Sequence, residues 1–154
     1  MSGLSDQKLF TEKFRLEALH LASCGNWVLS LRPGQLTLGA MVLSIGTGAT
    51  SLTELTSDDG RDMTVGFAQA ERLLQDTYGA VRLNLLCLMM QDPIVHFHIL
   101  PRYDCRVQRH GQDWSDFDWP GPPTVRPLQT PEPVLQAILA DLRAALLDPD
   151  PTHI

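Results

Sequence analysis

The chain has 154 residues, of which 44% are hydrophobic and 19% are charged, a balance typical of one globular domain. Its formal net charge of −6 at pH 7 argues against unspecific binding to nucleic-acid polymers, because such binding needs a basic surface. A small anionic ligand held in one local pocket is still compatible with this charge.

Cysteine usage and hydropathy indicate a protein of the cytoplasm. Cys24, Cys87 and Cys105 are odd in number and widely spaced, so we expect neither a disulfide framework nor a zinc motif. The first residues lack the cationic head and apolar core of a signal peptide. The longest apolar run, residues 85–90, is far shorter than the roughly 20 residues that cross a bilayer. We therefore expect a cytoplasmic protein that does not contact a membrane.

The first third of the chain predicts a short helix followed by strands. Residues 5–22 begin with a loose helical period of apolar residues and then alternate, which predicts a helix that continues as extended chain. Residues 26–31 predict a strand, and residues 32–35 predict a turn because they contain proline and glycine. A second, strongly apolar strand is expected over 36–45, and the glycines of 46–48 end it.

The clearest helix is expected from Ser57 to the residue before Gly79. Thr56 or Ser57 can cap its first turn, and Asp58 and Asp59 suit the positive end of a helix. Gly79 suits a helix terminus. Apolar residues recur at spacings of three and four and form one stripe, which we expect to face the core: Met63, Phe67, Ala70, Leu74 and Tyr78.

A hairpin is expected next, formed by residues 81–90 and 94–100 with a tight turn at 91–93. Residues 81–90 are apolar on both faces, which favours a central strand or a strand that a partner subunit covers.

The last third predicts an irregular segment and a final helix. Residues 104–127 are rich in polar residues, glycine and proline, and their aromatic residues Trp114, Phe117 and Trp119 are expected to pin the segment to the core rather than cover a nucleobase. The sequence Thr-Pro-Glu before residue 133 opens a helix over about 131–147, and the Asp-Pro-Asp-Pro of 148–151 ends it.

One predicted strand contains two histidines among apolar residues. Because side chains along a strand alternate between faces, His96 and His98 are expected to point the same way as Ile94. Two half-buried histidines satisfied by the backbone or by water are the simplest explanation. Two imidazoles can also bind zinc, but no third ligand follows at a suitable spacing. The third explanation is catalysis.

The segment 96–102, His-Phe-His-Ile-Leu-Pro-Arg, resembles the signature of the histidine triad (HIT) superfamily, in which histidines alternate with apolar residues ahead of Pro-Arg. The turn and apolar segment of 32–43 and the helix and hairpin of 57–103 are similar to the family as well, so the resemblance covers about 26–103. It implies a single domain over 1–154 with an α+β fold. The family has an antiparallel sheet of about five strands with helices packed on it, and its members are usually homodimers.

The resemblance also implies a nucleotide hydrolase or transferase that cleaves a nucleoside phosphate from its leaving group, such as a dinucleoside polyphosphate or a phosphoramidate. By position, His96 matches the nucleophile and His98 the third histidine of the triad. A neutral imidazole can attack phosphorus to form a nucleotidyl-histidine, and the second imidazole can donate a hydrogen bond to a phosphate oxygen. This chemistry requires no metal and no other cofactor.

Three further residues are candidates for substrate binding. Ser30 lies near the place where relatives have an asparagine for the ribose, and Gln91 can donate a hydrogen bond to the phosphate. Arg102 can contact phosphate, although an arginine that ends a strand is more often an ion-pair partner at the surface.

The sequence departs from the family pattern at two positions. Ile94 stands at the first triad position, and Ala40 follows Gly39 where relatives have a histidine. We expect Ile94 and Ala40 to form an apolar contact behind His96, while the main-chain carbonyl of Ile94 still orients the ring. The lost side chains would lower activity by about 10- to 100-fold. The alternative is therefore a catalytically weak or idle nucleotide-binding or regulatory module, and a purely structural dimeric protein is a third possibility.

Overall fold

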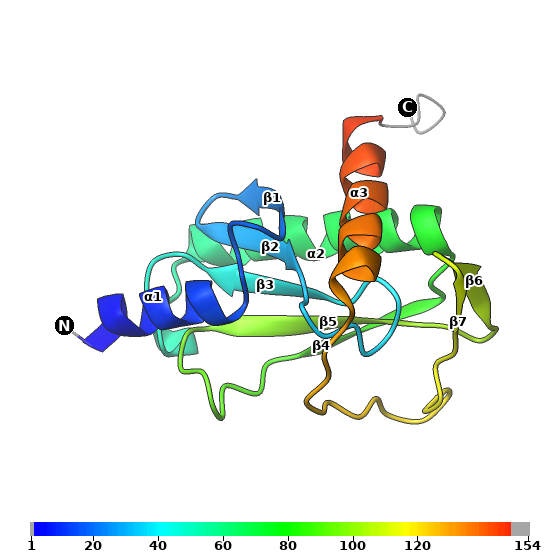
Figure 1. The fold of residues 1–154 in the computed structure, drawn as a ribbon. Helices are drawn as coiled ribbons and strands as arrows, with labels where there is room; N and C mark the ends of the chain where they lie inside the picture. The colour runs from blue at the N-terminus through cyan, green and yellow to red at the C-terminus, as the bar shows by residue number, and fades with distance from the viewer. Residues whose placement is uncertain (1, 149–154) are drawn as a thin grey trace.

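The computed structural model describes residues 2–148, in which a five-stranded antiparallel sheet is flanked by helices (Figure 1). Every pair of neighbouring strands is antiparallel. The expected α+β class and the five strands are thereby confirmed. The strand order is β1-β2-β3-β5-β4, with β1 (His20–Cys24), β2 (Trp27–Leu31), β3 (Met41–Ile45), β4 (Arg82–Leu86) and β5 (His96–Arg102).

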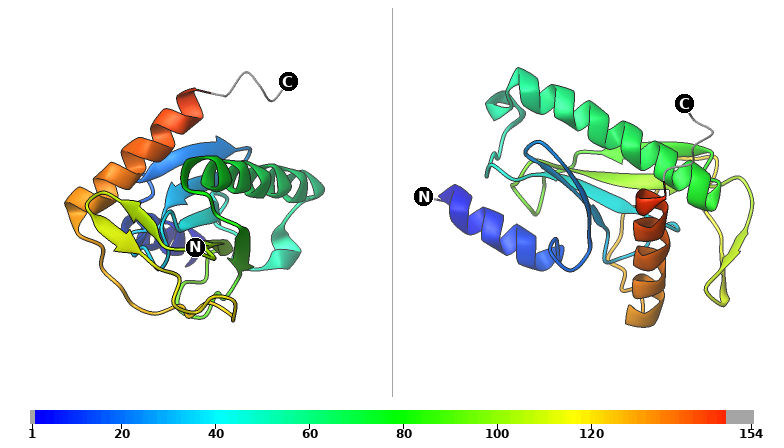
Figure 2. Two further views of the ribbon diagram at one scale, coloured as in Figure 1. Left: turned by 90° about the vertical axis from the view of Figure 1, so that its right-hand side faces the viewer. Right: turned by 90° about the horizontal axis from the view of Figure 1, so that it is seen from above.

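Helices α1 (Ser2–Lys13) and α2 (Ser57–Tyr78) lie on opposite faces of the sheet (Figure 2), and α3 (Glu132–Leu147) packs against α2 and β1. A short 3₁₀ helix, η1 (Leu52–Glu54), precedes α2. Within residues 2–148, no helix has the length and apolar character that crossing a membrane requires.

Helix α2 begins and ends as its sequence predicts. The Thr56 side chain accepts a hydrogen bond from Asp59 N, and the Asp59 side chain accepts one from Thr56 N, which forms a capping box. Gly79 adopts the left-handed conformation at φ 76° and ends the helix. Ala70 and Leu74 of the apolar stripe are fully buried, so the stripe faces the core as expected.

Strand β3 begins at Met41, and the prediction of a strand from residue 36 was wrong. The preceding segment is a loop wrapped around the buried Gln35 side chain. Its Oε1 accepts a hydrogen bond from Gly39 N, and its Nε2 donates to the carbonyls of Arg32 and Ala40. Gly39 has φ +87°, which L residues rarely adopt, so the turn depends on glycine here.

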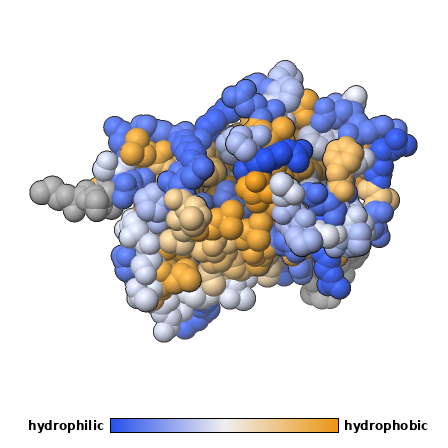
Figure 3. Space-filling view, turned by 90° about the horizontal axis from the view of Figure 1, so that it is seen from below, coloured by the Kyte–Doolittle hydropathy of each residue, from blue (hydrophilic) through white to orange (hydrophobic). Residues whose placement is uncertain are grey.

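Strands β4 and β5 form the expected hairpin, with pairs from Arg82–Arg102 to Leu86–His98. The connection between them runs over 87–95 and is longer than the predicted tight turn at 91–93. Strand β4 ends the sheet, so it is an edge strand and not a central one. Leu85 is 42% exposed, and seen from below the molecule has an apolar area at the centre of its face (Figure 3).

Residues 104–127 contain a short hairpin that the sequence patterns did not predict, β6 (Val107–Arg109) and β7 (Gln112–Trp114). Strands of three residues are too short to show an alternation. Phe117 is 88% exposed, so it does not pin this segment to the core. Of the predicted helix stop, residues 149–151 lie outside the described part of the chain.

Arg102 ends β5 in a buried ion pair. Its Nε donates to Asp116 Oδ2 at 2.6 Å, and both side chains are only 3% exposed. The guanidinium also donates to the side-chain oxygen of Asn84 and to the carbonyl of Gly121. Arg102 therefore joins the end of the hairpin to the segment that follows it, and its partner is buried and not at the surface.

We predict that Asp116→Asn lowers the free energy of unfolding by about 3–5 kcal/mol, because it leaves the Arg102 guanidinium buried without a counter-charge. Urea denaturation measures this change. Asp113→Asn is the matched control, because Asp113 pairs with Arg106 at 3.4 Å in an exposed site and should change stability by less than about 1 kcal/mol. Equal losses in the two variants would contradict the buried role of Arg102.

Candidate active site

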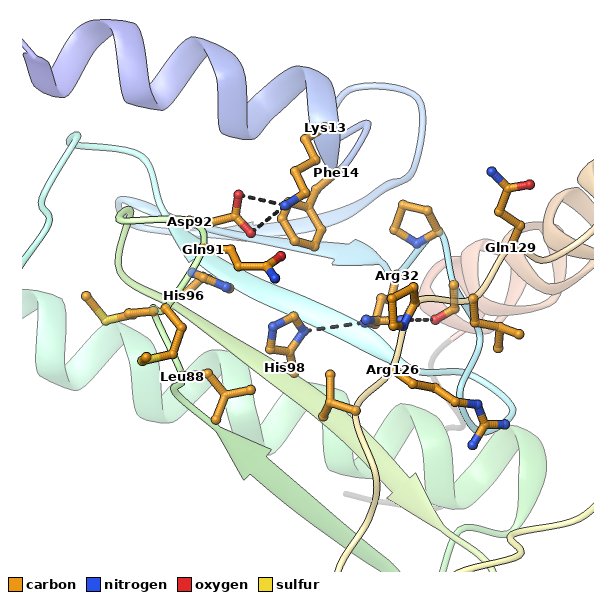
Figure 4. A pocket seen from close by; sticks show the side chains of 17 residues that line it. Lys13, Phe14, Arg32, Leu88, Gln91, Asp92, His96, His98, Arg126 and Gln129 are labelled. Atoms are coloured by element: carbon orange, nitrogen blue, oxygen red, sulfur yellow. Dashed lines mark hydrogen bonds and ion pairs between the residues drawn. The ribbon is translucent and has the colours of Figure 1, made fainter.

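The two histidines of β5 lie side by side, as the strand alternation predicts. His96 is paired with Ser44 and His98 with Val42 on β3, and the two ring centroids are 5.0 Å apart with planes at 78°. Both rings line one pocket of about 600 Å³ (Figure 4). The opposite face of β5 presents Phe97, which packs against the core at the α2 side.

The hydrogen bond of His96 determines which of its nitrogens can react. Nδ1 lies 2.6 Å from the carbonyl oxygen of Ile94, and a carbonyl can only accept, so Nδ1 carries the proton. Nε2 then keeps its lone pair. The rings of Phe10 on α1 and of Phe14 just after it have centroids 4.9 and 5.8 Å from that of the imidazole. Burial lowers the pKa of His96, so the ring is neutral at pH 7.

His98 is held in the opposite tautomer. Arg32 Nε donates to His98 Nδ1 at 3.4 Å, which leaves the proton of the neutral imidazole on Nε2. Burial, and to a smaller extent the positive charge of Arg32, lowers the pKa of His98 to about 4. The site therefore presents one ring nitrogen with a free lone pair and one with an N–H.

The pocket wall is assembled from four parts of the chain: the end of α1, the turn after β2, the connection 88–92 and the segment 125–129. It carries three basic side chains, Lys13, Arg32 and Arg126, against the single carboxylate of Asp92. Lys13 Nζ contacts both oxygens of Asp92, at 2.9 and 2.8 Å. An acidic protein thus gathers positive charge beside its histidines, which suits an anionic ligand.

The structure brings only part of the predicted substrate site together. Gln91 lines the pocket with the histidines. Ser30 is fully buried, and its hydroxyl donates to the carbonyl of Val42 at 3.5 Å, so it does not line the pocket. Arg102 lies away from the pocket in the ion pair described above.

Sequence reasoning missed the basic residues of the pocket. Lys13, Arg32 and Arg126 come from three regions that only the tertiary structure brings to the histidines. Arg32 had one local signal, because it directly follows a predicted strand and precedes the turn-forming Pro33.

The expected contact between Ile94 and Ala40 is wrong. Ala40 precedes Met41, which pairs with Ile99, whereas Ile94 precedes His96, which pairs with Ser44. The two residues therefore lie at opposite ends of the β3–β5 ladder, more than about 10 Å apart along the strands. Both are fully buried, each in its own surroundings. The carbonyl of Ile94 does orient His96 as expected.

Within residues 2–148, no three His, Cys, Asp or Glu side chains are grouped so that they could hold a metal ion. The pocket itself offers two imidazoles and the carboxylate of Asp92, which is engaged by Lys13.

Comparison with known proteins identifies the fold. No protein-family model and no curated protein matches the sequence. A histidine triad protein from Sinorhizobium meliloti is 20% identical with a TM-score of 0.64, and the match covers 84% of this chain and 92% of that one. A hypothetical histidine triad nucleotide-binding protein from Sulfolobus tokodaii is 13% identical with a TM-score of 0.66, and the match covers 94% of this chain and 92% of that one. A histidine triad protein from Marinobacter aquaeolei is 20% identical with a TM-score of 0.60, and the match covers 87% of this chain and 93% of that one. The chain therefore has the fold of the histidine triad proteins.

Proposed function

We propose that the protein is a nucleotide hydrolase or transferase that cleaves a nucleoside phosphate from its leaving group through a nucleotidyl-histidine intermediate. The observation that carries this proposal is the pair of tautomers in one pocket: His96 with a free Nε2 and His98 with its proton on Nε2. The shared fold supports it, and so does the nucleotide binding named for the relative from Sulfolobus tokodaii. Dinucleoside polyphosphates and nucleoside phosphoramidates are the proposed substrate classes.

In the proposed reaction, Nε2 of His96 attacks the phosphorus of the nucleoside phosphate. The bond from phosphorus to the leaving group breaks, and the leaving group takes the electron pair and then a proton from solvent. Water next attacks the nucleotidyl-histidine, which releases the nucleotide and restores the neutral ring; a different acceptor in place of water gives transfer. His98 donates its Nε2–H to a non-bridging oxygen, where negative charge increases during attack.

The rest of the pocket fits the phosphate groups of such a substrate. Lys13, Arg32 and Arg126 offset negative charge, and the Gln91 amide can donate to a phosphate oxygen. The reaction needs no metal or other cofactor, because the attacking imidazole is already neutral and the charge is met by these side chains.

An idle nucleotide-binding or regulatory module is the second candidate. Two features favour it. Isoleucine stands at position 94, where the resemblance places the first histidine of the triad. Phe10 and Phe14 also pack against His96, and only 2% of that residue is exposed. Such a module would bind AMP in the same pocket and turn over no substrate.

A homodimer forms part of the proposal. Strand β4 lies at the edge of the sheet, so the backbone groups along its outer side have no neighbouring strand in this sheet. Leu85 on this strand is 42% exposed and Met90 after it is 88% exposed. Covering them in a second subunit would remove apolar surface from water.

We predict that His96→Ala lowers the release of AMP from adenylated test substrates by more than about 1,000-fold, because it removes the nucleophile. Chromatography of the products measures the rate. His20→Ala is the control, since His20 on β1 contacts Ser23 and does not line the pocket. Turnover that survives the loss of His96 would contradict the mechanism. Calorimetric binding of AMP with no turnover by the unmodified protein would select the idle module.

The pH dependence follows from the lowered pKa of His96. An imidazole with the ordinary pKa of 6.5 loses its free lone pair as the pH falls through that value. Burial disfavours the charged ring, so His96 stays neutral to lower pH. We predict that kcat/KM, measured from pH 4 to pH 8, stays level through pH 6.5 and declines only below it. A decline with its midpoint at or above pH 6.5 would contradict the buried, neutral nucleophile.

A further inference from the structure

We propose that Arg32 is the positioning residue of His98: its guanidinium holds the imidazole as a neutral ring whose Nε2–H points at the phosphate. The proposal rests on the proposed function for the meaning of that N–H. The tautomer itself is a property of the protein without substrate, and it can be measured separately.

The backbone of Arg32 is fixed on both sides. Its N–H donates to the carbonyl of Ala40 at 2.9 Å, and its own carbonyl accepts from the buried Gln35 amide at 2.8 Å. Two hydrogen bonds thus fix the residue directly after β2, and its side chain reaches across β3 to His98 on β5. The position of the Arg32 side chain is therefore set by a backbone that hydrogen bonds hold on both sides.

The side chain is also held at two points. One terminal nitrogen donates to the carbonyl of Gly34 at 2.5 Å, and Nε donates to His98 Nδ1 at 3.4 Å, as Figure 4 shows. All guanidinium nitrogens are donors, so the imidazole nitrogen that faces them must be an acceptor. A neutral ring has a single proton, which therefore stays on Nε2.

The positive charge of Arg32, like its hydrogen bond, favours the neutral form of His98. In the described part of the chain, Arg32 forms no ion pair with a carboxylate, so its charge is not offset by a close partner. The other groups that face His98 are His96 on β5, Asp92 in the connection before it and Lys13 on α1, with Arg126 in the same pocket. Only Asp92 raises the pKa of His98, and Lys13 engages it.

The protonation form of His98 decides whether the ring can donate to the phosphate while it stays bound to Arg32. A protonated His98 would donate from both nitrogens and would repel Arg32, and this would break the contact that orients the ring. A neutral ring with the other tautomer would present a lone pair to the phosphate oxygen and repel it. Of the three forms, only the neutral ring with its proton on Nε2 both donates to the phosphate and keeps the hydrogen bond from Arg32.

The test is long-range ¹H–¹⁵N correlation NMR of the full, ¹⁵N-labelled protein, which reports the protonation of each nitrogen of His98. We expect an unprotonated Nδ1 and a protonated Nε2 at pH 7. Arg32→Met removes the donor and the charge, so the tautomer should become mixed and the pKa of His98 should rise toward 6.5. Arg32→Gln keeps an N–H but loses the charge, so the pKa should rise while the Nε2–H tautomer persists.

Arg126→Met is the matched control, because it removes a basic residue of the same pocket that forms no hydrogen bond to His98. Its His98 tautomer should be that of the unmodified protein. In activity, Arg32→Met should lower kcat by about 10- to 100-fold, as for other residues that orient a catalytic group, and Arg32→Gln should lower it less.

A proton on Nδ1 of His98 in the unmodified protein would overturn the proposal, and this result needs no variant to fold. An unchanged tautomer and pKa in folded Arg32→Met would overturn it as well. An unmodified protein that shows the expected tautomer but no turnover would instead contradict the proposed function and leave the role of Arg32 supported.

Discussion

The hydrogen bond between His96 Nδ1 and the carbonyl of Ile94 is the contact on which the site depends. It is buried, it spans two residues of the same segment, and it decides which ring nitrogen keeps a lone pair. Because the acceptor belongs to the main chain, any residue at position 94 can supply it. This explains in physical terms how isoleucine can stand at position 94 without disturbing the orientation of His96, the proposed nucleophile.

A second constraint is electrostatic. The chain has a net charge of −6, yet the proposed phosphate ligand needs positive charge around it. The fold meets this need locally by bringing basic residues from α1, from the turn after β2 and from the segment 125–129 to one pocket. Burial of the rings, with a smaller contribution from Lys13 and, for His98, from Arg32, keeps both imidazoles neutral. Neutral rings and a cationic wall together suit an anionic substrate.

Sequence patterns predicted the elements that depend on local physics. The capping box and glycine stop of α2, the β4–β5 hairpin and the shared face of His96 and His98 follow from residues close together in the chain. The start of β3 was missed because the Gln35 side chain satisfies the backbone of the preceding loop, a contact that no periodicity shows.

The predictions about the site that were wrong concern contacts between parts of the chain that are distant in sequence. Arg102 was considered for phosphate because it ends the histidine strand, but Asp116 and Asn84 bind it farther along the strand, away from the pocket. The contact expected between Ala40 and Ile94 needs a strand register that differs from the one found. Residues such as Lys13 become part of the pocket only when α1 folds over the sheet, and this cannot be read from the spacing in the sequence.

A crystal structure of the protein soaked with AMP tests the central claim most directly. The account predicts that phosphorus faces Nε2 of His96 and that a phosphate oxygen accepts a hydrogen bond from Nε2 of His98. A nucleotide bound elsewhere, or one that enters the pocket with its phosphate turned away from both rings, would contradict it.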